Sequence, residues 1–260
     1  MNDDEILSLM IKAAIEAGKV VMAFYQSGFK VQYKDDDSPV TSADLAASSL
    51  IRKILSPVCA GWLCEEDSDS KERLSLSELF IVDPLDGTQD FVNRNGSFSI
   101  NIAFIRDHKP VLSVIGLPAK NGYAYARKGA GAYIVLDGKK EKLAVSKRTS
   151  GFVYGISMTH NTDEEKAFAS SHASLISSTL ASGASTKGVL LAMGQVDASV
   201  RLTRHTKEWD VAAMDLLVKE AGGVFLDGLG KEFVYNRKDV YNRDGYSMFN
   251  SEKTKEQFLG

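Results

Sequence analysis

Acidic side chains follow directly after short apolar runs at two places in this chain. Glu65 and Glu66 come after the run at 62–64, and Asp83 and Asp86 come after the run at 79–82. A further acid, Asp210, opens an apolar-periodic segment. Because α/β folds place their ligand crevice at the carboxyl ends of buried strands, these acids are candidates for a functional site.

The segment from Asp83 to Thr88 has the residue types of a metal site beside an anion site. Pro84 fixes one backbone angle and forces a turn, which can bring the carboxylates of Asp83 and Asp86 to the same side. Two carboxylates at such a short distance repel each other unless a cation or a proton lies between them. Oxygen ligands without His or Cys favour Mg²⁺, Ca²⁺ or Mn²⁺ over zinc. If a helix or tight turn starts at Gly87 and Thr88, their N–H groups form an anion site, and the pair of sites is what phosphoryl transfer requires.

Each of these features also has a simpler structural interpretation. The acidic loop at 65–69 is typical of solvated surface, and Asp-x-x-Asp is built from ordinary turn residues. Trp209 followed by Asp210 is typical of a packed aromatic residue before an acid at a helix N-terminus. The conjunction of the features, rather than any one of them, predicts metal-dependent phosphate chemistry.

The composition is that of a globular protein and disfavours some classes of function. The 260 residues include 31 Lys and Arg against 34 Asp and Glu, a net charge of −3, and 44% are hydrophobic. This balance argues against a protein that binds nucleic acid by neutralising phosphates. No stretch approaches the roughly 20 apolar residues of a membrane span, and the acidic N-terminus is unlike a signal peptide. With only two cysteines, Cys59 and Cys64, the chain is expected to be cytoplasmic.

Hydrophobic periodicity predicts alternating helices and strands along the whole chain. Apolar residues at three- and four-residue steps predict helices at 3–27, 42–55, 163–180, 186–193 and 210–221. Alternating or short continuous apolar runs predict strands at 62–64, 79–82, 98–104, 111–117, 123–126, 155–158, 196–200 and 224–226. The lysine-rich run at 139–142 is expected to be a solvated connection. Helix and strand in both halves favour a layered α/β protein with two lobes, residues 1–142 and 143–260.

The candidate site residues lie in motifs that resemble the inositol monophosphatase superfamily of Mg²⁺-dependent, lithium-sensitive phosphatases. The segment at 83–88, with Phe91, resembles its first signature, and the segment at 209–223 resembles its second. The acidic pair at 65–66 and the segment at 38–44 match two further motifs, so four matches occur in order along essentially the whole chain. The resemblance implies an α/β (α+β) fold of alternating α-β-α-β-α layers, like that of inositol monophosphatase and fructose-1,6-bisphosphatase.

The resemblance also implies roles for the motif residues. The metal ligands would be Glu65, Asp83, Asp86, Asp210 and the carbonyl of Leu85. They would hold two or three Mg²⁺, with Mn²⁺ as a substitute and with Li⁺ and Ca²⁺ as inhibitors. Asp44 and Thr88 would orient and activate the attacking water, with Asp44 as a further candidate metal ligand, and the amides of Gly87 and Thr88 would hold the phosphate. Family members are often dimers, so a homodimer is expected by the same analogy.

Segments outside the metal motifs resemble the 3'(2'),5'-bisphosphate nucleotidases of this superfamily more than its inositol monophosphatases. The substrate contacts that these segments and the first signature imply are Gly87, Thr88, Lys34, His160, Ser185, Lys187, Arg204 and Glu208. Met158 and Ala184 depart from the nucleotidase pattern. The implied reaction is removal of the 3'-phosphate of adenosine 3',5'-bisphosphate by a metal-activated water that attacks the phosphate in line.

Two alternatives stay open at this stage. One is an inositol-1-phosphate or sugar-monophosphate phosphatase, in which Lys187 is a solvated helix residue and His160 a loop residue. The other, of a different class, is a regulatory or binding protein on an inherited phosphatase scaffold, since fold alone does not fix function. The enzymatic interpretations share one expected partner, a small phosphorylated substrate, and no direct contact with a membrane or nucleic acid.

Overall fold

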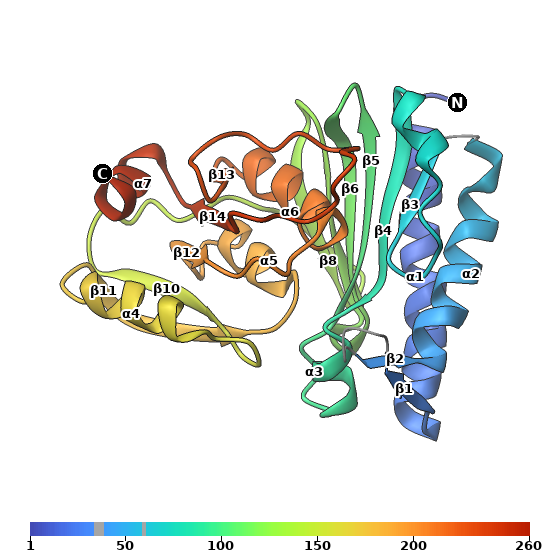
Figure 1. The fold of residues 1–260 in the computed structure, drawn as a ribbon, viewed down its shortest axis with the longest axis horizontal. Coiled ribbons are helices and arrows are strands. Elements are labelled where there is room, and N and C mark those ends of the chain that lie inside the picture. Colours follow the sequence, from blue (N-terminus) through green and yellow to red (C-terminus); the bar gives the residue numbers. More distant parts are fainter. Residues whose placement is uncertain (34–38, 59–60) are drawn as a thin grey trace.

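Five alternating layers of helix and sheet build this protein, in the order α-β-α-β-α (Figure 1). The structure is a computed structural model that describes residues 1–33, 39–58 and 61–260. Lys34 and Cys59 therefore lie outside the described residues. The layering confirms the architecture expected from the sequence.

The first layer consists of the long helices α1 (Asp3–Ser27) and α2 (Ser42–Leu55). A capping box starts α1, because Asn2 and Glu5 exchange side-chain-to-backbone hydrogen bonds of 2.9 and 3.0 Å. A second capping box, between Thr41 and Asp44, starts α2. The apolar faces of both helices are buried against the first sheet, and the short antiparallel pair β1 (Val31–Tyr33) and β2 (Pro39–Thr41) lies beside them (Figure 1).

The second layer is a seven-stranded sheet in the order β3-β4-β5-β6-β7-β8-β9. Its strands are β3 (Gly61–Cys64), β4 (Glu78–Asp86), β5 (Ser99–Arg106), β6 (Lys109–Leu117), β7 (Gly122–Arg127), β8 (Gly131–Leu136) and β9 (Lys139–Lys142). Only the pair β3–β4 is parallel within this sheet. Single-turn helices η1 (Ser56–Val58), η2 (Lys71–Ser75) and η3 (Pro118–Lys120) lie in its connections. Alternate residues of β4 and β5 enter two different cores, one on each face of the sheet.

The third, fourth and fifth layers come from the second half of the chain (Figure 1). Helices α5 (Thr186–Ala192) and α6 (Glu208–Glu220) fill the space between the sheets. The second sheet has the order β11 (Ile176–Ser182), β10 (Phe152–Ser157), β12 (Ala198–Arg201), β14 (Tyr246–Phe249) and β13 (Val224–Asp227). Helices α3 (Thr88–Val92), α4 (Asp163–Ser171) and α7 (Glu252–Leu259) complete the described elements. Aromatic residues of α4 and α7 pack on the outer face of the second sheet.

Two predicted elements differ from the structure. The helix expected at 163–180 is wrong in its second half, because α4 ends at Ser171 and 176–182 forms strand β11, parallel to β10. Strand β11 is at the edge of the sheet and only half-buried at its apolar positions, so its side chains carry no clear alternation. The run at 139–142 is exposed as expected, but it is an edge strand rather than a connection.

The boundary predicted at 142/143 falls just after β9, and one hydrophobic core extends across it. That core joins the inner face of the first sheet to α5, α6 and β13. Among the described residues, no helix is long and apolar enough to cross a membrane. The division into two lobes stays a prediction, while the shared core fixes α6 against the strands that carry the acidic residues.

Candidate metal centre and cleft

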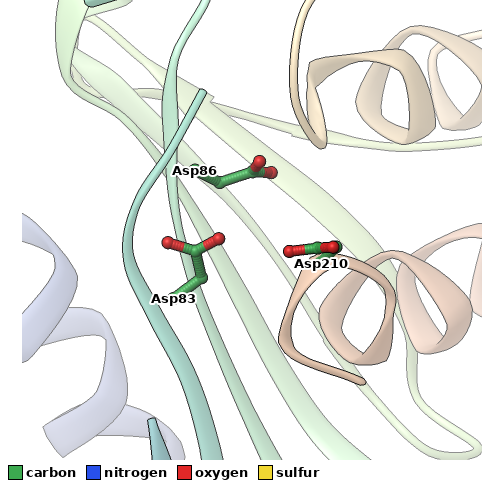
Figure 2. A group of neighbouring side chains, drawn as sticks. All are labelled: Asp83, Asp86 and Asp210. Carbon is green, nitrogen blue, oxygen red and sulfur yellow. The ribbon is translucent and has the colours of Figure 1, made fainter. Parts of the chain in front are cut away.

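Three carboxylates converge where β4 meets the first turn of α6. The side chains of Asp83, Asp86 and Asp210 point toward one another, and each offers an oxygen within 4.8 Å of the others (Figure 2). Asp83 and Asp86 are three residues apart, so a regular strand would turn them to opposite faces. A bulge corrects this, because Asp83 pairs with Asn101 but Asp86 pairs with Ser99, which leaves one extra residue on β4. The turn predicted at Pro84 is thus a bulge within a continuing strand.

The three carboxylates lie in an environment that disfavours their negative charge. Burial raises the pKa of Asp83 well above its ordinary value, and the charges of Glu65, Asp86 and Asp210 raise it further. Burial, Asp86 and Glu65 raise the pKa of Asp210 in the same way. Glu65 thus acts on the same cluster, which agrees with its predicted place. An oxygen-only set of mutually repelling carboxylates, of which Asp83 is buried and Asp86 and Asp210 are half-buried, fits a hard divalent cation such as Mg²⁺.

The predicted water-activating pair is in contact beside the cluster. The Thr88 hydroxyl lies 3.1 Å from Asp44 Oδ1 and 3.1 Å from the carbonyl oxygen of Leu85. The other oxygen of Asp44 accepts hydrogen bonds from the backbone N–H and the hydroxyl of Thr41. Burial raises the pKa of Asp44, although these hydrogen bonds oppose the shift. Asp44 is thereby held in one orientation toward Thr88.

Gly87 lies between the acidic end of β4 and the start of α3, where the chain turns. Its φ of +87° is in the left-handed region that favours glycine. A Cβ at this position would lie 3.1 Å from the Cβ of Ala184 and 3.2 Å from the carbonyl oxygen of Ser97. Gly87 therefore permits both the turn and the close approach of the 183–185 loop.

A cleft of about 780 Å³ opens onto the carboxylates, and both halves of the chain line it. Glu65, Asp83, Asp86 and Asp210 form its acidic side. Lys187 and Arg201 belong to the same cleft, and both are buried. The cleft therefore combines an acidic cluster with two buried cationic side chains, and Lys207 lines it as well.

Lys187 is a buried ammonium group whose surroundings compensate its charge only in part. It is 3% exposed, and within the described residues its Nζ makes one long hydrogen bond, of 3.4 Å, to the carbonyl oxygen of Ser182. Burial and, secondarily, the charge of Arg201 lower the pKa of Lys187 to about 8, although the charges of Asp86, Glu165 and Asp90 oppose the shift. The alternative that Lys187 is a solvated helix residue is wrong.

Arg201 lies at the end of β12 and holds the opposite wall of the cleft. Its Nη1 donates to Glu165 Oε2 at 2.6 Å and to the carbonyl oxygen of His160 at 2.8 Å. His160 itself is exposed and lines the cleft. Arg201 therefore fixes the segment that places His160 at the entrance.

The remaining predicted substrate contacts lie elsewhere. Ser185 is fully buried and donates to Asp86 rather than facing the open cleft. Glu208 is also buried, and its carboxylate accepts hydrogen bonds from the backbone N–H groups of Asn236 and Arg237 at 2.8 and 2.9 Å. Arg204 is exposed and is not among the described residues that line the cleft.

The sequence analysis missed one residue of the site, Asn101. Its Nδ2 donates to Asp86 Oδ2 at 2.9 Å and to the Ser185 hydroxyl at 2.8 Å. The available signal was its position, because Asn101 is a polar residue inside a strand that is buried on both faces. Such a residue needs hydrogen-bond partners, which here are Asp86 and Ser185.

Comparison with known proteins agrees with this geometry. The model of the inositol monophosphatase family matches residues 2–257. The 3'(2'),5'-bisphosphate nucleotidase CysQ of Aggregatibacter actinomycetemcomitans is 34% identical over 248 residues, which cover 94% of this chain and 92% of that protein. CysQ of Escherichia coli K12 is 32% identical, with 94% and 99% of the two chains covered.

Solved structures give the same result at the level of the fold. CysQ from Bacteroides thetaiotaomicron, described as a bacterial member of the inositol monophosphatase family, has a TM-score of 0.83 at 29% identity and covers 94% of this chain and 96% of its own. The Thermotoga maritima IMPase has a TM-score of 0.81 at 27% identity, with 97% and 94% covered. The chain therefore belongs to the inositol monophosphatase family and is a metal-dependent phosphatase, a phosphoric monoester hydrolase.

Proposed function

We propose that this phosphatase removes one phosphate from a small substrate that carries two, the 3'-phosphate of adenosine 3',5'-bisphosphate. The observation that supports this proposal is the pair of buried cations, Lys187 and Arg201, in the cleft of the acidic cluster. Burying the Lys187 ammonium group is costly, and the charges of Asp86, Glu165 and Asp90 offset that cost only in part, since the pKa of Lys187 is still lowered. A second phosphate would supply an anion that offsets the remainder.

The acidic cluster would hold the metal that the reaction needs. Glu65, Asp83, Asp86, Asp210 and the carbonyl of Leu85 are the proposed ligands of two or three Mg²⁺. A divalent ion bound there supplies a water of lowered pKa and neutralises charge on the phosphate. The number of ions, replacement by Mn²⁺ and inhibition by Li⁺ or Ca²⁺ stay predictions.

The chain's own residues orient the attacking water. The Thr88 hydroxyl lies 3.1 Å from Asp44 Oδ1, so the two side chains act as one unit. Asp44 accepts the proton of the water, which suits a carboxyl whose pKa burial has raised. The N–H groups of Gly87 and Thr88 hold the phosphate in line with that water.

Substrate choice is the finer part of the proposal. The CysQ relatives are named as bisphosphate nucleotidases, and their names support the two-phosphate substrate. The Thermotoga maritima IMPase, a neighbour of similar TM-score, supports the second candidate, an inositol or sugar monophosphate. His160, Ser185, Arg204, Glu208 and Lys34 stay predictions as substrate contacts, as do the homodimer and the cytoplasmic location.

A substrate panel tests the proposal directly. The purified protein with Mg²⁺ is assayed for phosphate release from adenosine 3',5'-bisphosphate, adenosine 3'-monophosphate and inositol 1-phosphate. We expect the highest kcat/KM for the bisphosphate, and a clear preference for inositol 1-phosphate would contradict the proposal. Asp86→Asn should abolish hydrolysis of all three substrates without unfolding the protein.

Lys187→Ala separates the two candidate substrates. Loss of a buried charge partner costs about 2–4 kcal/mol, so kcat/KM for the bisphosphate should fall roughly 30- to 900-fold. The monophosphates should be affected much less. Lys166→Ala is the matched control, since Lys166 is exposed on α4 and pairs only locally with Asp163 at 2.8 Å. Equal losses for all substrates would argue against a second phosphate at Lys187.

A further inference from the structure

Ser185 lies where the two halves of the metal centre meet. It ends the short connection between β11 and α5, and it is fully buried. Its N–H and its hydroxyl both lie 2.7 Å from Asp86 Oδ2. The same hydroxyl lies 3.1 Å from the carbonyl oxygen of Asp210. One serine therefore contacts the segments that carry two of the clustered carboxylates.

The hydrogen bonds around Asp86 distinguish its two oxygens. Asn101 Nδ2 donates to Oδ2 at 2.9 Å, and the Ser99 hydroxyl lies 3.4 Å from the same atom. Every hydrogen bond that the described residues give to the Asp86 side chain ends on Oδ2. Oδ2 is therefore saturated with donors, and Oδ1 is left as the oxygen that can bind a cation.

The backbone conformation at 183–184 places the N–H and the hydroxyl of Ser185 next to Asp86. Ala184 has a φ of +49°, in the left-handed region that residues with a Cβ rarely adopt. A Cβ on Gly183 would lie only 2.1 Å from Asp90 Oδ2, so only glycine fits there. A sparsely populated conformation next to a tight contact persists where surrounding structure imposes it, commonly at functional sites.

We propose that Ser185 is a positioning residue of the metal centre, which orients Asp86 so that Oδ1 faces the cation and joins Asp86 to the start of α6. This inference rests on the proposed metal site. It assigns Ser185 to the metal rather than to the substrate contact that the sequence predicts. Partners that orient metal ligands change metal affinity when they are removed, typically by 10- to 100-fold.

Direct metal binding without substrate tests this assignment. Isothermal titration calorimetry measures the binding of Mn²⁺ to the wild type, Ser185→Ala and Ser185→Thr. We expect Ser185→Ala to bind Mn²⁺ roughly 10- to 100-fold more weakly, and Ser185→Thr, which keeps the hydroxyl, to recover most of the affinity. Ser199→Ala is the matched control, because that buried hydroxyl donates to the carbonyl oxygen of Gly155 at 2.8 Å in the second sheet.

The outcomes separate this inference from the proposed function. If the wild type binds Mn²⁺ and Ser185→Ala binds it within about twofold, the positioning role is wrong while the metal site stands. If the wild type does not bind Mn²⁺, the proposed metal site and this inference both fail. An increased KM for the phosphate substrate with unchanged Mn²⁺ affinity would return Ser185 to substrate binding and overturn the inference.

A second variant keeps the test decisive if Ser185→Ala does not fold. Asn101→Ala removes the other side-chain donor that lies within 3 Å of Asp86 Oδ2. We expect it to weaken Mn²⁺ binding in the same direction, with thermal unfolding as the check that the variant is folded. A folded Asn101→Ala with wild-type affinity for Mn²⁺ would overturn the inference independently.

Discussion

Asp210→Asn should stabilise the metal-free protein and remove most of its response to Mg²⁺. The substitution takes away one of three carboxylates whose oxygens lie within 4.8 Å of one another. The local helix start is kept, because an Asn side-chain oxygen can accept the hydrogen bond that the Lys207 N–H donates to Asp210 Oδ2 at 2.7 Å. The change in the free energy of unfolding therefore measures the effect of removing the negative charge of Asp210.

The size of the effect follows from the geometry of the cluster. Two ionised carboxylates 4.8 Å apart repel each other by about 3.5 kcal/mol at an effective dielectric constant of about 20. The folded protein relieves part of this repulsion by retaining protons, since burial, Asp86 and Glu65 raise the pKa of Asp210. We expect a net gain of about 1–3 kcal/mol in the free energy of unfolding, or roughly 2–6 °C in Tm for a chain of this size.

The gain should depend on pH with a defined sign. The raised pKa values of Asp83 and Asp210 mean that the folded state binds more protons than the unfolded state. Stability of the metal-free wild type therefore falls as pH rises from about 4, the ordinary carboxyl pKa, to the raised folded-state pKa. The advantage of Asp210→Asn should be small in acid and largest above that range.

Calorimetric unfolding at several pH values, with EDTA or with Mg²⁺, measures both effects. Mg²⁺ at about 100 times its Kd should stabilise the wild type by about 2.7 kcal/mol and Asp210→Asn by much less. Asp215→Asn on the same helix is the control. Asp215 is buried in an ion pair with Lys219 at 2.8 Å and accepts a hydrogen bond from Tyr235, away from the three-carboxylate cluster, so Asp215→Asn should leave the Mg²⁺ response intact.

Two results would refute this reasoning. A metal-free Asp210→Asn variant that unfolds at or below the wild-type Tm in alkaline buffer would show that repulsion within the cluster does not limit stability. Equal stabilisation of wild type and variant by Mg²⁺ would show that Asp210 is not a ligand.

Three further predictions concern the cleft and its supporting loop. The pKa of Lys187 is lowered to about 8, so its side chain loses its positive charge as pH increases through 8. KM for the bisphosphate should therefore rise over that range, while KM for a monophosphate stays nearly constant. Parallel pH profiles of the two KM values would contradict this. Gly183→Ala would bring a Cβ within 2.1 Å of Asp90 Oδ2, so urea unfolding should show a loss of about 1–3 kcal/mol, and wild-type stability would contradict the close packing. Asp44→Asn should lower kcat by about 10²- to 10⁴-fold, because it removes the proposed acceptor of the water proton. The Mn²⁺ affinity measured by calorimetry should change little, because Asp44 pairs with Thr88 outside the three-carboxylate cluster. Loss of Mn²⁺ binding would instead show that Asp44 is a metal ligand.

The sequence predicted the elements whose burial is periodic. Helices α1 and α2 each bury a regular set of apolar positions, so their predicted ranges agree closely with the structure. Strand β5 is buried on both faces, and its period of two comes from the large apolar side chains at alternate positions. Strand β11 buries little and lies at a sheet edge, so the sequence carries no such pattern there and the predicted helix is wrong. Periodicity therefore reports burial, and it fails where pairing along the backbone, rather than burial, forms the element.

The site shows the same limit at the level of single residues. The acids could be predicted because their chemistry is visible in their types, but their convergence depends on a bulge between Asp83 and Asp86 that the one-dimensional pattern does not contain. The contact between Ser185 and Asp86 could not be predicted from the sequence either. The two residues are 99 positions apart, and only the packing of α5 against the first sheet brings them together.

A cluster of repelling charges persists because the elements that carry it are fixed independently. Helix α6 buries Val211, Ala212, Met214, Leu216, Leu217 and Val218 in the core that it shares with the first sheet. A buried Val, Leu or Met side chain contributes about 1.5–3 kcal/mol, so a few of them outweigh the roughly 3.5 kcal/mol of repulsion per ionised pair. The bulged end of β4 is fixed in the same way by its pairing with β5. The carboxylates therefore cannot separate to relieve their repulsion, which leaves retained protons or a bound cation to relieve it.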